Sequence, residues 1–175
     1  MKERLVVVSN RIPTDAEPSG GLMVALDACL SNTGGLWVGC DPDPVDHAQD
    51  TLSPIGDGAY RRLTFTVTAE EHQNFYLGYC NSVLWPLFHR RRDLMANSAA
   101  HNTAYATVNA RVARALTRAL TPNDPIWVHD YHFLPLGAEL RRLGVRNPIG
   151  FFLHTPFPLR ADLPALPPKR RQTPI

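Results

Sequence analysis

The chain has 175 residues, of which 44% are hydrophobic and 19% charged, and its formal net charge is +2. That length fits one domain with a buried core, and so small a charge gives no reason to expect nucleic acid or a membrane surface as a partner. Three cysteines at irregular spacing predict no disulfide framework and favour a reducing, cytoplasmic location, and no segment resembles a signal peptide or a membrane span.

The first element is a buried strand over residues 5–8, a run of Leu and Val that stops at Ser9-Asn10-Arg11. A glycine pair at residues 20–21 then opens a helix that ends before Gly35. A helix amino terminus approached by glycines offers free N–H groups to an anion such as phosphate. The alternative is that the glycines only shape the turn, since no dinucleotide fingerprint is present.

The middle of the chain predicts two further strands, over residues 36–40 and 62–67, separated by a loop rich in Pro, Asp and Gly. Thr68 and Glu71 form a capping box that starts a short helix ending near residue 79. Residues 83–89 are aromatic and interrupted by a proline, which predicts neither a regular helix nor a strand.

The clearest helix is predicted over residues 102–120, where apolar side chains recur at helical spacing. Its arginines, at positions 111, 114 and 118, fall on the opposite face and are expected to be solvated. A strand at 125–128, a helix at 134–143 and a strand at 148–153 follow.

Apolar strands that alternate with helices indicate an α/β fold with a parallel sheet covered on both faces. Ligands of such sheets bind beyond the carboxyl ends of the strands. His129, Asp130 and His154 follow directly on two predicted strands, so they lie where this kind of fold places its chemistry.

Several side chains near strand ends suit a sugar or a phosphate. Arg11 could hold a phosphate through a bidentate contact, although a surface ion pair is the alternative for any single arginine. Asp130 could accept from sugar hydroxyls and His154 could donate to one, unless they form a buried polar pair. Tyr76 and Trp85 could form an aromatic wall for a sugar ring, whereas Trp37, inside a strand, is expected in the core.

Two other kinds of chemistry are not expected. The two histidines of His129-Asp130-Tyr131-His132 follow a strand, and strand alternation gives such a spacing poor ligand geometry, so no metal site is predicted. No serine or cysteine stands in the context of an activated nucleophile.

Six stretches, in the same order along the chain, resemble the amino-terminal domain of the trehalose-6-phosphate synthases, a family of retaining glycosyltransferases with two Rossmann-like domains. The stretches are VVVSNR at residues 6–11, GGL at 20–22, GLWVG at 35–39, NSVLWP at 81–86, WVHDYH at 127–132 and GFFLHTPFP at 150–158.

The resemblance implies the first half of a GT-B enzyme: a Rossmann-like acceptor-side domain over residues 1–158. From residue 159 the sequence departs from the family pattern, and the Pro- and Arg-rich stretch 159–175 is expected to be a disordered tail. The second domain of the family, which binds the donor, is not expected in this sequence.

The resemblance also implies an activity and a set of roles. The family transfers glucose from UDP-glucose to glucose 6-phosphate, without a cofactor and without a protein nucleophile, in trehalose biosynthesis. By correspondence, the substrate-binding residues for glucose 6-phosphate are Arg11, Tyr76 and Trp85. Gly21 corresponds to the backbone contact to the donor diphosphate, and the catalytic positions beside the reacting sugars are Asp130 and His154.

The sequence also departs from the family within the acceptor site. The family has a tryptophan where this chain has Cys40, so an aromatic surface for the acceptor is missing. Three hypotheses follow: an enzyme of the family, a non-catalytic sugar-phosphate-binding module, or an inert remnant. A homo-oligomer, or a partner chain that supplies the second domain, is the expected macromolecular partner, and Phe151, Phe152 and Phe157 are expected to be exposed on that side.

Overall fold

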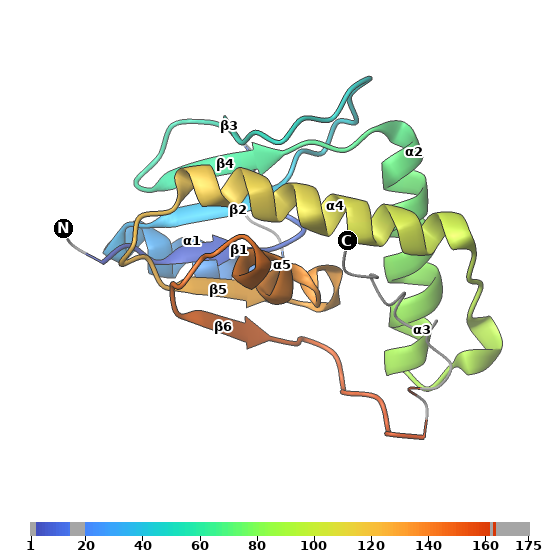
Figure 1. Ribbon diagram of the computed structural model, residues 1–175. Coiled ribbons are helices and arrows are strands. Elements are labelled where there is room, and N and C mark those ends of the chain that lie inside the picture. Colours follow the sequence, from blue (N-terminus) through green and yellow to red (C-terminus); the bar gives the residue numbers. More distant parts are fainter. Residues whose placement is uncertain (1–2, 15–19, 162, 164–175) are drawn as a thin grey trace.

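The computed structural model describes residues 3–14, 20–161 and 163, so the expectations for residues 164–175 lie outside the described residues. Figure 1 shows one sheet with helices on both faces and one long helix across its end. The elements in order are β1 (Val6–Val8), α1 (Gly21–Thr33), β2 (Leu36–Cys40), β3 (Ser53–Pro54), β4 (Arg61–Phe65), α2 (Ala69–Glu71), the π-helix η1 (His72–Leu84), α3 (Trp85–Phe88), the 3₁₀-helix η2 (Arg92–Leu94), α4 (Ala99–Ala119), β5 (Ile126–His129), the 3₁₀-helix η3 (Tyr131–Phe133), α5 (Leu136–Arg142) and β6 (Ile149–Phe152).

The sheet has the strand order β3-β4-β2-β1-β5-β6, and every pairing is parallel except that of β3 with β4. The predicted α/β class with a Rossmann-like parallel sheet is therefore confirmed. β1 lies in the centre, with Val8 opposite Val38 of β2 and Val128 of β5. After β1 the chain adds β2 and β4 on one side of it and later β5 and β6 on the other, so the strand order reverses at β1.

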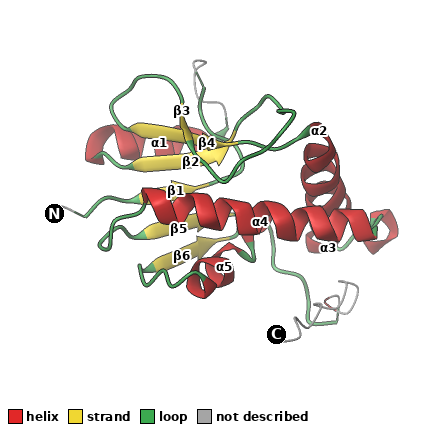
Figure 2. Ribbon diagram, turned by 45° about the horizontal axis from the view of Figure 1, so that its top comes forward, coloured by secondary structure: helices red, strands yellow, loops and turns green. Residues whose placement is uncertain are grey.

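Each valine of β1 is fully buried, and alternation sends them into two different cores. Val6 and Val8 pack in the larger core, which α4, α5 and the long helix α2-η1-α3 cover. Val7 packs with Trp37 and with Leu30 of α1 on the other face. Figure 2 shows α4 crossing the strands on one side of the sheet and α1 on the other.

The prediction that residues 83–89 lack regular structure is wrong. α2, η1 and α3 follow one another without a break, so this stretch continues a helix, with Pro86 in the first turn of α3. Proline has no N–H to donate to the preceding turn. The carbonyl of Ser82, four residues before Pro86, instead accepts a hydrogen bond from the Ala96 N–H at 2.9 Å.

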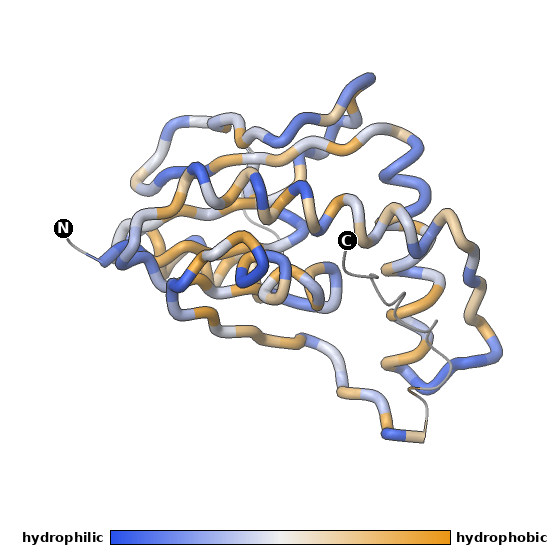
Figure 3. Tube along the Cα trace, in the orientation of Figure 1, coloured by the Kyte–Doolittle hydropathy of each residue, from blue (hydrophilic) through white to orange (hydrophobic). Residues whose placement is uncertain are grey.

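β6 lies at the edge of the sheet and is poorly covered, so the prediction of a strand buried on both faces does not hold for it. Figure 3 shows its hydrophobic colouring along this open edge. The expected exposure of the nearby phenylalanines is confirmed, at 45% for Phe151, 50% for Phe152 and 68% for Phe157.

Gly78 of η1 packs tightly against His101 of α4. A Cβ at this position would lie 2.5 Å from Cδ2 of His101. We therefore expect Gly78→Ala to destabilise the chain, because overpacking costs about 1–3 kcal/mol while the gain in helix propensity is at most about 1 kcal/mol. Urea unfolding measures this.

The matched control is Gly137→Ala in α5, where the nearest atom to an added Cβ lies 4.0 Å away on Ile149. That variant is expected to be as stable as the parent chain or slightly more stable. Equal effects of the two substitutions would contradict the close approach.

Candidate functional site

The carboxyl ends of the five parallel strands meet at one edge of the sheet, which the long helix α2-η1-α3 crosses (Figure 1). A cavity of about 440 Å³ opens there. Its walls come from the segment after β1, the first turn of α1, the segments after β2 and β4, and the first turns of η1. The lining residues are Asn10, Arg11, Ile12, Pro13, Thr14, Met23, Cys40, Asp41, Pro42, Val67, His72, Phe75 and Tyr76.

Arg11 is held at the mouth of this cavity by a short chain of hydrogen bonds. The buried Trp37 donates from Nε1 to Oγ of Ser9 at 2.7 Å, and Ser9 donates from Oγ to the carbonyl of Arg11 at 2.6 Å. The backbone is thus anchored to the core while the guanidinium is exposed, and within the described part of the chain no carboxylate pairs with it. An arginine so placed can bind an anion without first breaking an ion pair with a described residue.

Gly39 allows the segment after β1 to lie against β2. A Cβ on Gly39 would come within 2.6 Å of Cβ of Ile12, so a larger residue would push this segment away. The Cys40 N–H donates to the carbonyl of Asn10 at 2.9 Å and fixes the same approach. The glycine therefore determines where Arg11 lies.

Tyr76 stands between two histidines. Its ring lies 5.4 Å from that of His72, one helical turn earlier, and stacks on His132, at 5.7 Å and 15°. Burial lowers the pKa of His132 to about 3, so this histidine is neutral and acts as an apolar support for the tyrosine. His132, which follows β5, thereby holds Tyr76 in place as an aromatic wall of the cavity.

The remaining polar groups of the cavity are mostly acceptors. Oδ1 of Asn10 is buried and has no hydrogen-bond partner within the described residues, so a ligand hydroxyl would satisfy it. Asp41 accepts from Oγ1 of Thr64 at 3.0 Å. Burial, together with the nearby carboxylates of Asp41 and Glu71, raises the pKa of Cys40 to about 12, so its thiol is neutral and not a nucleophile.

The predicted catalytic residues form a second cluster beyond β5 and β6. Asp130 turns the chain with a positive φ of 70°, and its Oδ1 accepts from the backbone N–H of His154 at 3.4 Å. Nδ1 of His129 lies 3.0 Å from Nε2 of His154. As expected, these residues follow the carboxyl ends of β5 and β6, whereas the catalytic roles of Asp130 and His154 stay predictions.

Like Asp130 and His154, two further predicted site residues lie outside the cavity lining. Trp85 is 42% exposed farther along the long helix, where it stacks on His89 with ring centroids 4.2 Å apart. Gly21 begins α1 after Gly20, whose φ is +93°, and no heavy atom lies within 4 Å of a Cβ built on Gly21. Met23, in the same turn of α1, lines the cavity, whereas Gly21 does not.

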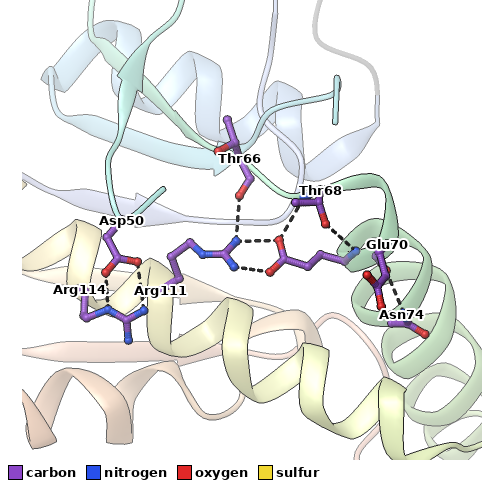
Figure 4. A network of polar contacts seen from close by, with 8 residues as sticks. Asp50, Thr66, Thr68, Glu70, Asn74, Arg111 and Arg114 are labelled. Carbon is purple, nitrogen blue, oxygen red and sulfur yellow. Dashed lines mark hydrogen bonds and ion pairs between the residues drawn. The ribbon is translucent and has the colours of Figure 1, made fainter. Parts of the chain in front are cut away.

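A buried ion pair supports the helix that carries His72 and Tyr76 (Figure 4). Glu71 accepts from two nitrogens of Arg111 in α4, and from the Thr68 backbone N–H at 3.1 Å. Arg111 also donates to the carbonyl of Thr66. The expectation of a solvated role is wrong for Arg111, because it is buried in an ion pair with Glu71. Glu71 lies far from it in the sequence, so the local pattern of the helix could not show this pair.

The neighbouring arginines of α4 are more exposed. Arg114 pairs with Asp50, with the side chains 40% and 33% exposed, and Arg118 donates to the Asp50 carbonyl. Arg118 keeps the predicted exposure.

The Glu71 pair predicts a pH dependence of stability. Burial acts to raise the pKa of Glu71, but hydrogen bonds from Arg111 and Thr68 and the guanidinium charge outweigh it and leave the pKa below its ordinary 4.5. The stabilisation is therefore complete above the unfolded-state pKa and is lost as the pH falls through the lower folded-state pKa.

We expect Glu71→Gln to be less stable than the parent chain at about pH 7, and the difference to shrink as the pH falls through the lowered folded-state pKa of Glu71, because the protonated side chain is neutral like glutamine. Urea unfolding at a series of pH values from neutral to acidic measures this. A difference that is constant with pH would show that the charge of Glu71 contributes nothing.

Sequence reasoning placed His129 at the candidate site but missed Asn10, His72 and His132 as parts of it. Asn10 carried a signal, because it follows a buried strand as directly as Arg11 does. His72 lies one turn before Tyr76 in the capped helix and could have been placed beside it. The contact of His132 with Tyr76 joins two distant segments and gave no local signal.

The described residues contain no group of three or more His, Cys, Asp or Glu side chains arranged to hold a metal ion. None of the helices they form has both the length and the hydropathy that a membrane crossing needs.

The doubly wound sheet, with polar segments gathered at the point where the strand order reverses, defines the class: a Rossmann-like domain. A trehalose-6-phosphate synthase from Klebsiella pneumoniae is 44% identical over 168 residues, which are 94% of this chain and 35% of that protein. A crystal structure of an alpha,alpha-trehalose-phosphate synthase (UDP-forming) from Burkholderia vietnamiensis superposes with a TM-score of 0.89 at 42% identity, covering 95% of this chain and 37% of that one.

A further structure, of the enzyme with the same description from Burkholderia xenovorans in complex with glucose-6-phosphate, has a TM-score of 0.83 and 40% identity, covering 93% of this chain and 35% of that one. The sequence model of glycosyltransferase family 20 matches residues 3–173. The chain belongs to glycosyltransferase family 20. It spans about 35% of the length of the curated relatives that it matches.

Proposed function

We propose that this chain forms the glucose 6-phosphate side of a trehalose-6-phosphate synthase. The observation that carries the proposal is Arg11, which is anchored through Ser9 to Trp37 and lines the same cavity as Tyr76. A sugar phosphate needs both of these groups, a cation for the phosphate and an aromatic surface for the ring. The Burkholderia xenovorans relative, described as a complex with glucose-6-phosphate, supports the choice of ligand.

The identity of the sugar donor follows from comparing the atoms of the product with those of the acceptor. Trehalose 6-phosphate contains one glucosyl group more than glucose 6-phosphate, and the relatives are described as UDP-forming. The donor is therefore UDP-glucose. The anomeric hydroxyl oxygen of the acceptor bonds to the anomeric carbon of the donor, the bond from that carbon to the diphosphate breaks, and the hydroxyl proton passes to the departing phosphate oxygen.

This route needs no nucleophile from the protein, and the described site supplies none. The Cys40 thiol is kept neutral, and Oγ of Ser9 is engaged with Trp37 and Arg11. The protein contributes position and electrostatics. In this proposal Arg11, Tyr76 and Trp85 hold the acceptor, the N-terminal turn of α1 at Gly21 faces the donor diphosphate, and Asp130 and His154 line the reacting sugars.

The remaining donor contacts come from outside the described residues, in a second domain or a partner chain. We place the reaction in the cytoplasm, where a nucleotide sugar meets a sugar phosphate. The free thiols of Cys29, Cys40 and Cys80 support a reducing compartment.

A chimera tests the activity. This chain replaces the corresponding amino-terminal segment of the Klebsiella pneumoniae relative, and UDP release is measured with UDP-glucose and glucose 6-phosphate. We expect release only when both sugars are present, and an Arg11→Ala chimera should need a much higher glucose 6-phosphate concentration. A folded chimera that binds glucose 6-phosphate without releasing UDP would favour the non-catalytic binding module.

The exposed phenylalanines predict self-association of the isolated chain. Phe152, in the edge strand β6, and Phe157, which stacks on Phe88 of α3, are at least half exposed. Unpaired sheet edges and exposed apolar side chains favour association. Sedimentation velocity should show oligomers that diminish in Phe152→Ser. A monodisperse monomer of the parent chain at high concentration would contradict this prediction.

A further inference from the structure

Two histidines from neighbouring strand ends make one close polar contact. His129 ends β5, is 1% exposed, and packs against the rings of Trp127, at 4.3 Å, and Phe152, at 6.4 Å. His154 follows β6 and is exposed. Nδ1 of His129 lies 3.0 Å from Nε2 of His154, and the two rings stack at 20°.

A hydrogen bond between two neutral imidazoles contains one proton, which belongs to one ring or the other. Burial, with a smaller contribution from His154, lowers the pKa of His129 to about 4, so His129 is neutral near neutral pH. If His129 donates from Nδ1, its Nε2 carries no proton and has a free lone pair. If His154 donates, His129 must carry its own proton on Nε2.

The surroundings of Nε2 of His129 decide between the two arrangements. This atom is buried and has no hydrogen-bond partner in the described part of the chain. Buried N–H groups without an acceptor are rarer in proteins than acceptors with an unused lone pair. The arrangement with the proton on Nδ1 of His129, shared with His154, is therefore the more stable one.

We propose that His129 is a positioning residue that donates from Nδ1 to Nε2 of His154 and thereby fixes the proton of His154 on Nδ1. The Nε2 lone pair of His154 is then occupied and cannot take a proton from the acceptor hydroxyl. The exposed Nδ1–H remains available as a hydrogen-bond donor at the carboxyl edge of the sheet.

This assigns His154 a role within the proposed function, on which the inference rests. His154 donates a hydrogen bond to an oxygen of a bound sugar or phosphate and does not act as the general base. The backbone of His154 is fixed from the same strand end, since its N–H donates to Oδ1 of Asp130 at 3.4 Å. Ring and backbone are thus both oriented by the end of β5.

The test is the tautomer of His154, measured by long-range ¹H–¹⁵N correlation spectra of the full chain without ligand. The spectra are recorded at about pH 8.5, roughly two units above the ordinary histidine pKa. The His154 signals are assigned by their loss in His154→Gln. We expect the protonated ¹⁵N shift at Nδ1 and the unprotonated shift at Nε2.

Two variants separate positioning from packing. His129→Phe keeps a ring but removes the donor, and His154 should then show averaged shifts of both tautomers. His129→Asn keeps an N–H donor on Cγ, where Nδ1 was, and should preserve the Nδ1–H form. His154 protonated on Nε2 in the parent chain, or unchanged shifts in folded His129→Phe, would overturn the proposal. No ligand is present, so a failure of the proposed enzymatic function would leave these results unchanged.

Discussion

Replacing Arg11 by alanine is expected to weaken the binding of glucose 6-phosphate by about 10- to 100-fold. A charge-assisted hydrogen-bonded contact contributes roughly 1.5–3 kcal/mol, and each 1.4 kcal/mol corresponds to about a tenfold change in affinity. The guanidinium has no carboxylate partner within the described residues, so its loss leaves no buried charge behind. Calorimetric titration of parent and variant measures the effect.

The fold should survive this substitution, because exposed side chains outside special environments change stability by about 0.5 kcal/mol or less. Arg146→Ala is the matched control. Arg146 is exposed and precedes β6, so it lies near the amino-terminal ends of the strands, whereas the cavity lies at their carboxyl ends. Unchanged affinity in Arg11→Ala, or an equal loss in both variants, would remove Arg11 from the site.

Replacing Arg111 by methionine is expected to destabilise the chain by about 3–5 kcal/mol, the range measured when one partner of a buried ion pair is removed. The side chains of Arg111 and Glu71 are only 10% and 17% exposed. Without Arg111, the Glu71 carboxylate stays largely buried and the carbonyl of Thr66 loses its donor. Urea unfolding of the variant measures the loss.

Two control variants test whether the loss of stability comes from the buried ion pair. Arg118→Met, on an exposed position of α4, should cost less than about 1 kcal/mol. The double variant Glu71→Gln/Arg111→Met should recover part of the loss, because no charge is then left without a partner. A double variant less stable than Arg111→Met would contradict a pair held mainly by charge.

Local patterns were sufficient for much of the fold. The run of valines before Ser9, the capping box of Thr68 and Glu71, and the apolar spacing of the helix containing Val108 each depend on neighbours a few residues apart. The structure has them where the sequence predicted them. The parallel order of the sheet followed from strands alternating with helices.

The failures have one physical cause: partners that are distant in the sequence. Arg111 is buried because Glu71, at the start of another helix, neutralises it. Pro86 is tolerated in a helix because the Ala96 N–H satisfies the Ser82 carbonyl. The open edge at β6 depends on which strand comes last in the sheet, and no single stretch shows that.

The candidate site likewise combines residues that local patterns predict with contacts between distant segments that they do not. Arg11, Asp130 and His154 were predicted because each follows a strand and the ends of parallel strands meet at one edge. That Tyr76 lines the cavity depends on the helix crossing this edge and on its stacking against His132. Trp85, predicted with Tyr76 as an aromatic wall for a sugar ring, lies outside the cavity lining.

The most direct measurement is calorimetric titration of the folded chain with glucose 6-phosphate, with glucose as the comparison. Saturable heat with glucose 6-phosphate and much weaker binding of glucose is the result expected from a cavity in which Arg11 holds the phosphate. No heat with glucose 6-phosphate, from a chain whose circular dichroism shows a folded α/β protein, would contradict an acceptor site in this domain.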